Sequence, residues 1–127
     1  MAITQIQVAV PTPYVLFTDS AMGNTVDAVK ASSATVYNVL IDNTANAGAP
    51  RYVKLFNLAQ GSITLGTTVP DEVIYVPAAS KVTHLLFTGA VPGVVFSSAL
   101  SAACVTTGGT AGTVAPTSSV PVTISYT

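Results

Sequence analysis

The chain has no charged residue after Lys81, so residues 82–127 contain no Asp, Glu, Lys or Arg. Such a stretch cannot form an ordinary water-facing surface, because about a quarter to a third of a soluble surface is charged. Gly, Pro, Ser and Thr interrupt every apolar run before it reaches the roughly 20 residues of a membrane-spanning helix. We therefore expect this part of the chain to be buried against other copies or a partner, and not in lipid.

The whole chain is also poor in charge. It has 127 residues, of which 7% are charged, and its mean hydropathy is +0.61. One domain of this mass would expose roughly 6,300 Å² to solvent, which nine charged residues are too few to cover. This shortage indicates a large, weakly charged contact area, as in an obligate assembly subunit.

Charge and cysteine content argue against several classes of protein. A net charge of −1 provides no electrostatic attraction for nucleic acid or anionic lipid, so we expect neither partner. Cys104 is alone, so the chain does not depend on an oxidising compartment. The first residues lack the basic and apolar regions of a secretory signal. We expect assembly in the cytoplasm of the producing cell.

Short segments rich in Val, Ile, Thr, Tyr and Phe are broken by turn residues about every 8 to 12 positions, and no window has a convincing helical period. This pattern predicts an all-β fold with two packed antiparallel sheets. A jelly roll is the first choice and another Greek-key sandwich the second. We divide the chain into an N-terminal arm or edge strand, residues 1–20, and a β-sandwich domain, residues 21–127.

The expected strands are residues 14–18, 25–31, 34–42, 51–58, 73–76, 82–88, 94–100, 103–107 and 120–126. The strands at 34–42 and 51–58 are expected to form a hairpin through the loop 43–50. Pro121 places the last strand at a sheet edge or makes the proline its start. The Gly-rich segment 107–119 predicts a long, mobile hairpin connection.

The chain offers little for catalysis. His84 and Cys104 are the only residues of their types, and a Cys/His pair would also need an orienting group and an oxyanion hole that no motif marks. We favour a hydrogen-bonded strand histidine and a buried cysteine. A single-chain zinc site is disfavoured because it needs three or four ligands, although a site on a symmetry axis using His84 or Asp42 stays open. We expect no enzyme activity, cofactor or metal.

Aromatic residues leave one binding alternative open. Sugars could stack on tyrosines, although tyrosine is equally common in strands and at interfaces. The five candidates are Tyr14, Tyr37, Tyr52, Tyr75 and Tyr126.

Two segments resemble small structural proteins of tailed bacteriophage virions. They are ATVYNVLIDNTANAGAPRYVKLFN, residues 34–57, and VVFSSALSAACVTTGGTAGTVAP, residues 94–116. The residues that match the family pattern are Val39, Leu40, Ile41, Asp42, Asn43, Thr44, Tyr52, Val53, Lys54, Leu55, Phe96, Ser97, Leu100, Thr106, Thr107 and Gly108. These motifs are structural and not catalytic.

The resemblance implies a capsid decoration or cement protein that binds the major capsid protein, stabilises the head and is commonly a trimer. The alternative is a head-fibre or tail-associated module that binds a receptor or carbohydrate. The expected location is the capsid surface of the virion. An arm that adds to a neighbouring sheet by edge pairing predicts interface residues Ile3, Ile6, Val8, Val10, Tyr14 and Phe17.

Overall fold

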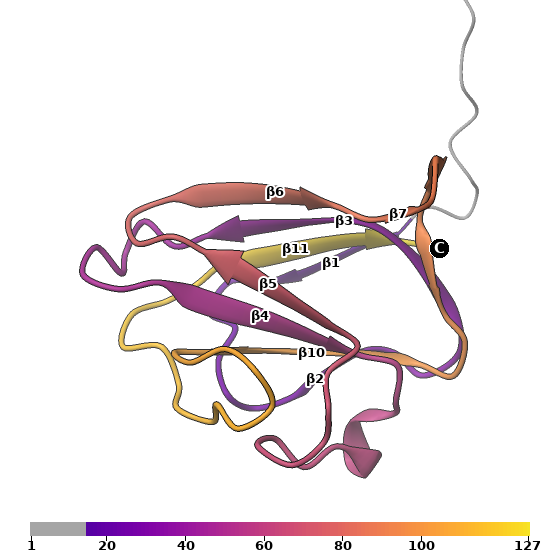
Figure 1. Ribbon diagram of the computed structural model, residues 1–127, viewed down its shortest axis with the longest axis horizontal. Helices are drawn as coiled ribbons and strands as arrows, with labels where there is room; N and C mark the ends of the chain where they lie inside the picture. Colours follow the sequence, from indigo (N-terminus) through magenta and orange to yellow (C-terminus); the bar gives the residue numbers. More distant parts are fainter. Residues whose placement is uncertain (1–14) are drawn as a thin grey trace, which may run out of the picture.

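The computed structural model describes residues 15–127. They form two antiparallel sheets that pack as a sandwich, so the predicted all-β, two-sheet class is confirmed (Figure 1). Sheet A has the strand order β1 (Val15–Asp19), β11 (Val122–Tyr126), β3 (Ala34–Asp42) and β6 (Lys81–Leu85), and β9 (Val94–Phe96) pairs with the start of β3. Sheet B has the order β2 (Asp27–Lys30), β10 (Leu100–Val105), β4 (Arg51–Phe56) and β5 (Glu72–Val76).

Two smaller elements complete the fold. The strands β7 (Phe87–Thr88) and β8 (Val91–Pro92) form a hairpin that follows β6. A short 3-10 helix, η1 (Gln60–Ser62), lies between β4 and β5. Among the eight main strands, only β4 and β5 are consecutive strands within one sheet, and every other link crosses to the opposite sheet. This connectivity is compatible with a jelly roll.

The predicted hairpin between residues 34–42 and 51–58 is wrong. Both strands exist, but β3 pairs with β11 and β6 in sheet A, whereas β4 pairs with β10 and β5 in sheet B. The loop 43–50 therefore crosses between sheets. Pro121 precedes the first residue of β11, which lies between β1 and β3, so the proline marks a strand start and not an edge.

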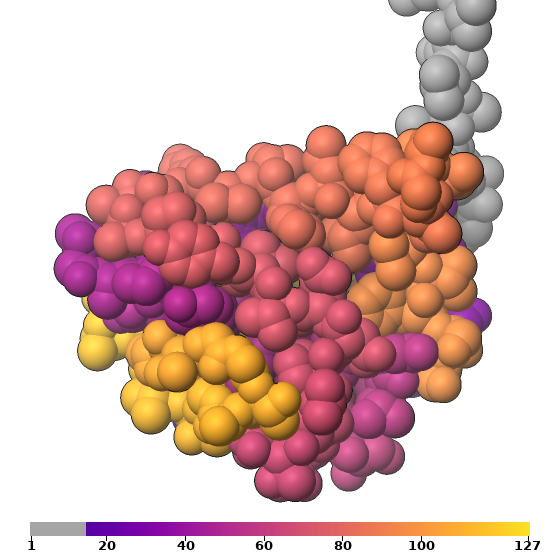
Figure 2. All heavy atoms as spheres, in the orientation of Figure 1, coloured from indigo at the N-terminus to yellow at the C-terminus, as the bar shows by residue number. Residues whose placement is uncertain are grey.

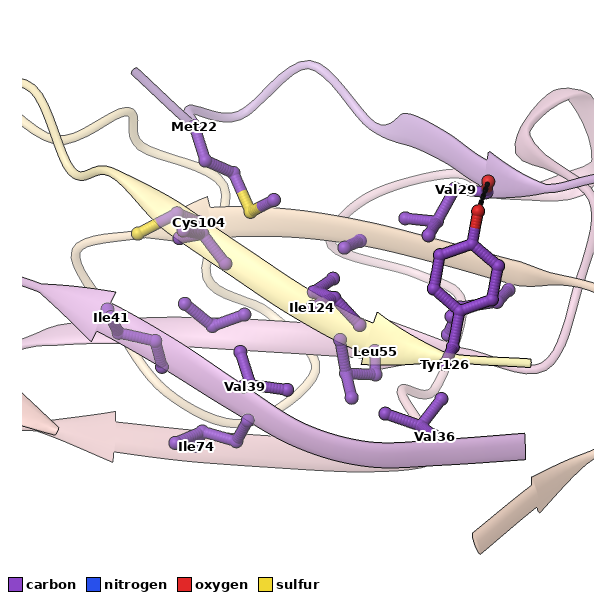
Figure 3. Packing of buried hydrophobic residues seen from close by; sticks show 14 of the residues in the cluster. Met22, Val29, Val36, Val39, Ile41, Leu55, Ile74, Cys104, Ile124 and Tyr126 are labelled. Atoms are coloured by element: carbon purple, nitrogen blue, oxygen red, sulfur yellow. Dashed lines mark hydrogen bonds between the residues drawn. The ribbon is translucent and has the colours of Figure 1, made fainter. Parts of the chain in front are cut away.

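The core lies between the sheets, where alternate residues of each strand meet (Figure 3). Val39 and Ile41 of β3 and Ile124 of β11 face Val53 and Leu55 of β4, and all five are buried. These are the inward positions that strand alternation predicts. The hydroxyl of Tyr126 donates a 3.4 Å hydrogen bond to the carbonyl of Val29 and so joins the two sheets.

A bulge in β3 changes which residues point inward. Ser125 pairs with Asn38, but the next residue, Tyr126, pairs with Val36, so Tyr37 is the extra residue. Val36 and Val39 are therefore both buried although they are three positions apart. The Tyr37 backbone carbonyl accepts a 3.0 Å hydrogen bond from Leu86, where the predicted strand 82–88 breaks into β6 and β7.

Candidate functional site

The charged residues are less available to water than the composition suggests. All nine lie within residues 15–127. Arg51 and Lys54, both on β4, are buried, with 5% and 0% of their surface exposed. At most seven charged side chains therefore reach solvent, and the shortage of charge on the surface is greater than the sequence alone implied.

Lys54 projects from the outer face of sheet B and is covered by the connection between β10 and β11, residues 106–121. Its ammonium group donates hydrogen bonds to the backbone carbonyls of Gly112, at 2.8 Å, and Thr110, at 3.3 Å. Burial lowers the pKa of Lys54. The lysine thus ties the middle of this connection to the sheet.

Arg51 ties the later part of the same connection. Its guanidinium group donates to the Thr117 hydroxyl at 3.1 Å, the Asn46 side-chain oxygen at 3.0 Å and the Pro50 carbonyl at 2.7 Å. The Asn46 oxygen also accepts a 3.1 Å hydrogen bond from the backbone N–H of Ser118. The predicted mobile hairpin connection is therefore wrong: the segment crosses from sheet B to sheet A and is held by buried side chains.

This connection covers part of the outer face of sheet B. Its atoms, coloured orange to yellow, lie on the visible face of the molecule (Figure 2). Gly108 lies so close to Tyr52 that an added Cβ would be 2.8 Å from the ring, and Tyr52 is half-buried as a result. Tyr75 on β5 stays 55% exposed, with its ring centroid 5.5 Å from that of Tyr52.

The outer face of sheet A contrasts with that of sheet B. Strand register places two rows of four side chains side by side across β1, β11, β3 and β6. We call these eight residues the sheet A face: Leu16, Ser125, Asn38 and Leu85 in one row, and Thr18, Thr123, Leu40 and Thr83 in the other. Leu16, Leu85 and Leu40 are 60%, 56% and 45% exposed. Four strands thus carry a face of Leu, Thr, Ser and Asn with no charge.

Hydrogen bonds already pair polar groups within the sheet A face. The Ser125 hydroxyl donates to the Asn38 side-chain oxygen at 2.9 Å, and the hydroxyls of Thr18 and Thr123 are 3.4 Å apart. Ser125 is only 3% exposed despite pointing outward. Burying these groups would cost little free energy, because they keep a partner when water leaves.

The charged residues of sheet A all lie at one end. Asp42 and Lys81 are cross-strand neighbours in the row that follows the sheet A face. Asp19, at the same end of β1, is in register with the core residue Val122. The Asp42 carboxylate accepts hydrogen bonds from the hydroxyl and the backbone N–H of Thr44, which lower its pKa. Lys81 is 3.8 Å from Asp42, and its side chain is 73% exposed.

The opposite end of sheet A is apolar. There the hairpin β7–β8 and strand β9 expose Phe87, Val91 and Val95, which are 50%, 64% and 64% exposed. No charged residue occurs in residues 82–127, which supply these exposed apolar side chains. The sheet A face is therefore continuous with an uncharged, partly apolar surface.

Most predicted interface residues lie outside the described part of the chain. These are Ile3, Ile6, Val8, Val10 and Tyr14. Phe17 is in β1, where it is partly buried and packs against the core. Of the range 1–20 that we separated as an arm or edge strand, Val15–Asp19 pairs with β11 as an edge strand of sheet A.

The candidate catalytic residues are in different sheets. His84 in β6 has its Nε2 atom 3.2 Å from the Glu72 carboxylate on β5. Cys104 in β10 is buried, and burial raises the pKa of its thiol to about 12. A thiol with this pKa is not ionised near neutral pH, so it is a poor nucleophile.

Within residues 15–127, no group of three or more His, Cys, Asp or Glu side chains is placed to hold a metal ion. Over the same residues, no helix is long and apolar enough to cross a membrane.

Comparisons with known proteins identify no relative. No family model, no curated protein and no solved structure matches this chain.

Sequence reasoning predicted a weakly charged contact area but missed the residues of the sheet A face. A signal was present in two places where apolar residues do not alternate with polar ones. In Val39-Leu40-Ile41 and Leu85-Leu86-Phe87, residues that should face water are apolar as well. Leu40, Leu85 and Phe87 are the exposed members of these runs.

Proposed function

We propose that the protein is a non-enzymatic structural subunit of a virion, a capsid decoration or cement protein that binds the head lattice of a tailed bacteriophage. The observation that supports this best is the sheet A face, four strands wide and without a charge. A face of this kind is suited to contact with protein, because it can leave water without desolvating an ion. The resemblance of residues 34–57 and 94–116 to phage structural proteins supplies the type of assembly.

In this proposal the subunit is a trimer, and its partners are copies of itself and the major capsid protein. The subunit folds in the host cytoplasm and then binds the outside of the shell. Residues 3–10 provide an attachment segment that pairs with an edge of a neighbouring sheet. Association stabilises the particle through buried apolar area, at about 25 cal/mol per Å² before the costs of association are subtracted.

The deciding experiment is the copy number of this chain in purified particles, measured by quantitative mass spectrometry against the most abundant shell protein. We expect a ratio near one copy per shell subunit. A ratio of a few per cent would contradict a decoration role and favour a fibre or tail module. Absence of the chain from particles would refute a virion role altogether.

The attachment segment has its own test. A variant that lacks residues 2–12 is mixed with shells stripped of this chain, and bound protein is measured by co-sedimentation. We expect much weaker binding than for the full chain, with an unchanged circular dichroism spectrum showing that the sandwich still folds. Equal binding of the two proteins would remove residues 2–12 from the attachment mechanism.

A second candidate function is carbohydrate binding by a fibre or tail module. It is favoured by Tyr75, which is exposed beside Tyr52 on sheet B and offers an aromatic ring to a sugar. A glycan-array experiment with the full chain and with Tyr75→Ala tests it. Binding that is lost in Tyr75→Ala would support this function in place of capsid decoration.

A further inference from the structure

The two outer faces of the sandwich differ in how the chain itself covers them. On sheet B, Lys54 and Phe56 project outward but are fully buried. On sheet A, Leu16, Leu40 and Leu85 project outward and are about half exposed. The same protein thus buries the outward side chains of one sheet and leaves apolar side chains of the other in water, at a cost that burial would recover.

We propose that the sheet A face is the contact surface between copies of this chain, with three copies placing this face around a common three-fold axis. This inference deepens the proposed function, on which it rests, by naming the surface through which the subunits meet. The attachment to the shell then uses a different part of the molecule.

Charge favours another copy of the chain as the occupant. A partner with an ordinary charged surface would have to bury unpaired ions against Leu40 and its neighbours, which costs several kcal/mol per ion. A second sheet A face presents no such ion, and the polar pairs Ser125–Asn38 and Thr18–Thr123 each keep a hydrogen bond within their own copy. The face is therefore complementary to itself in charge and polarity.

The width of the face fits a three-fold arrangement. Four strands spaced by about 4.8 Å form a face about 19 Å wide. Three such faces closing a triangle lie about 5.5 Å from the central axis. This is close to half the roughly 10 Å that separates two packed sheets, so side chains from three copies fill the centre without a channel.

The same geometry says which residues approach the axis. The middle of the face lies between β11 and β3, the two inner strands of sheet A. Thr123 and Leu40 are neighbours there, at paired positions. Copies of these two residues from three subunits would meet at the centre. The charged pair Asp42 and Lys81 lies at the end of the sheet, where it can stay in water.

The first test is the molar mass of the full chain and two variants by sedimentation equilibrium. We expect the unmodified chain to be a trimer at micromolar concentration. Leu40→Lys places three ammonium groups at the axis, so we expect dissociation to monomers and association at least about tenfold weaker. Val114→Lys is the matched control, because Val114 is 62% exposed on the connection that covers sheet B. It should remain a trimer.

A second test does not depend on tolerance of a buried lysine. Cys104 is buried, so Thr123→Cys provides the accessible thiol of the chain. A short bismaleimide that reacts with Thr123→Cys while subunits exchange should link subunits into covalent dimers within each trimer, leaving the third subunit unlinked. Val114→Cys should stay unlinked at the same protein concentration. Circular dichroism and the urea unfolding midpoint establish that each variant is folded.

Several results would overturn the inference. They are a full chain that is monomeric or dimeric at about 100 μM, a trimer that Leu40→Lys leaves intact, and cross-linking of Val114→Cys but not Thr123→Cys. Another such result is a monomer whose urea unfolding midpoint is lowered by Leu40→Lys only when residues 2–12 are present. That result would mean that the chain covers its own sheet A face. Copy number in particles separates the two proposals: a monomer present at one copy per shell subunit refutes this contact but not the decoration role.

Discussion

The ammonium group of Lys54 and the carbonyl oxygen of Gly112 are 2.8 Å apart and joined by a buried hydrogen bond. This bond links the middle of β4 to a connection that follows β10, more than fifty residues later in the chain. The bond helps to hold the connection over the outer face of sheet B, whereas Leu16, Leu40 and Leu85 on the outer face of sheet A stay about half exposed.

Replacing Lys54 with methionine should destabilise the protein. The methionine has a similar length but cannot donate, so the carbonyls of Gly112 and Thr110 lose a buried partner. We expect a loss of about 1–3 kcal/mol in the free energy of unfolding. Urea unfolding measures it, and hydrogen exchange should show faster exchange in residues 106–119. Lys81→Met, at an exposed side chain, is the control and should change stability by less than about 0.5 kcal/mol. Equal losses in the two variants would contradict this role for Lys54.

Gly112→Ala tests the close packing of the same connection. An added Cβ would lie 2.0 Å from the carbonyl oxygen of Thr107, so the backbone must move. We expect destabilisation of about 1–3 kcal/mol by urea unfolding. Gly48→Ala provides the comparison, because no atom lies within 4 Å of its added Cβ. A Gly112→Ala protein as stable as Gly48→Ala would mean that the connection is loosely packed.

Strand positions could be predicted from the sequence better than strand partners. Residues 34–42 were predicted with the bounds that β3 has, because Val, Ile and Thr alternate there between the turn residues Ser33 and Asn43. The hairpin from β3 to β4 was wrong because alternation specifies which side chains share a face but not which strand lies beside them. The loop 43–50 could join neighbours in one sheet or cross to the other sheet.

The sequence predicted that the protein has a weakly charged contact surface, but not where that surface lies. Few charges and the charge-free residues 82–127 indicated a contact surface. Locating it required knowing which outer face the chain covers. That cover depends on Lys54 and Arg51, which are far in sequence from residues 106–119, and on Gly108, which looks like an ordinary loop residue in the sequence. The burial of both cations of β4, Arg51 and Lys54, could not be anticipated, since Lys and Arg are almost never fully buried.

Cys104 should be protected from thiol reagents in the folded protein. Its side chain is buried and its pKa is raised to about 12, so the reactive thiolate is scarce and inaccessible. We expect reaction with an aromatic disulfide reagent to be at least about 100-fold slower in buffer than in concentrated urea at the same pH. Val114→Cys, at a residue that is 62% exposed, is the comparison and should react in buffer at close to the unfolded rate. Rapid labelling of native Cys104 would contradict the core position.

Asp27→Asn should stabilise the protein at neutral pH. Burial, a hydrogen bond with Asp19 and the charge of Asp19 raise the pKa of Asp27 from 3.8 to about 6, and Asp27 Oδ2 has no hydrogen-bond partner. The folded state therefore binds a proton more tightly than the unfolded state, so this group's contribution to stability is full below about pH 4 and is lost as pH rises through about 6.

Removing the carboxylate should abolish that loss. We expect Asp27→Asn to be more stable at pH 7 by up to about 1 kcal/mol, a value reduced for solvent screening because the side chain is only partly buried. The gain should shrink towards zero at pH 4. Urea unfolding of both proteins at intervals between pH 4 and pH 7 measures the difference. Asp19→Asn should reproduce part of the effect, because it removes the neighbouring charge while its side-chain oxygen can still accept from the backbone of Ala21. Stability curves that stay parallel across this range would show that the two carboxyl groups are not coupled in the fold.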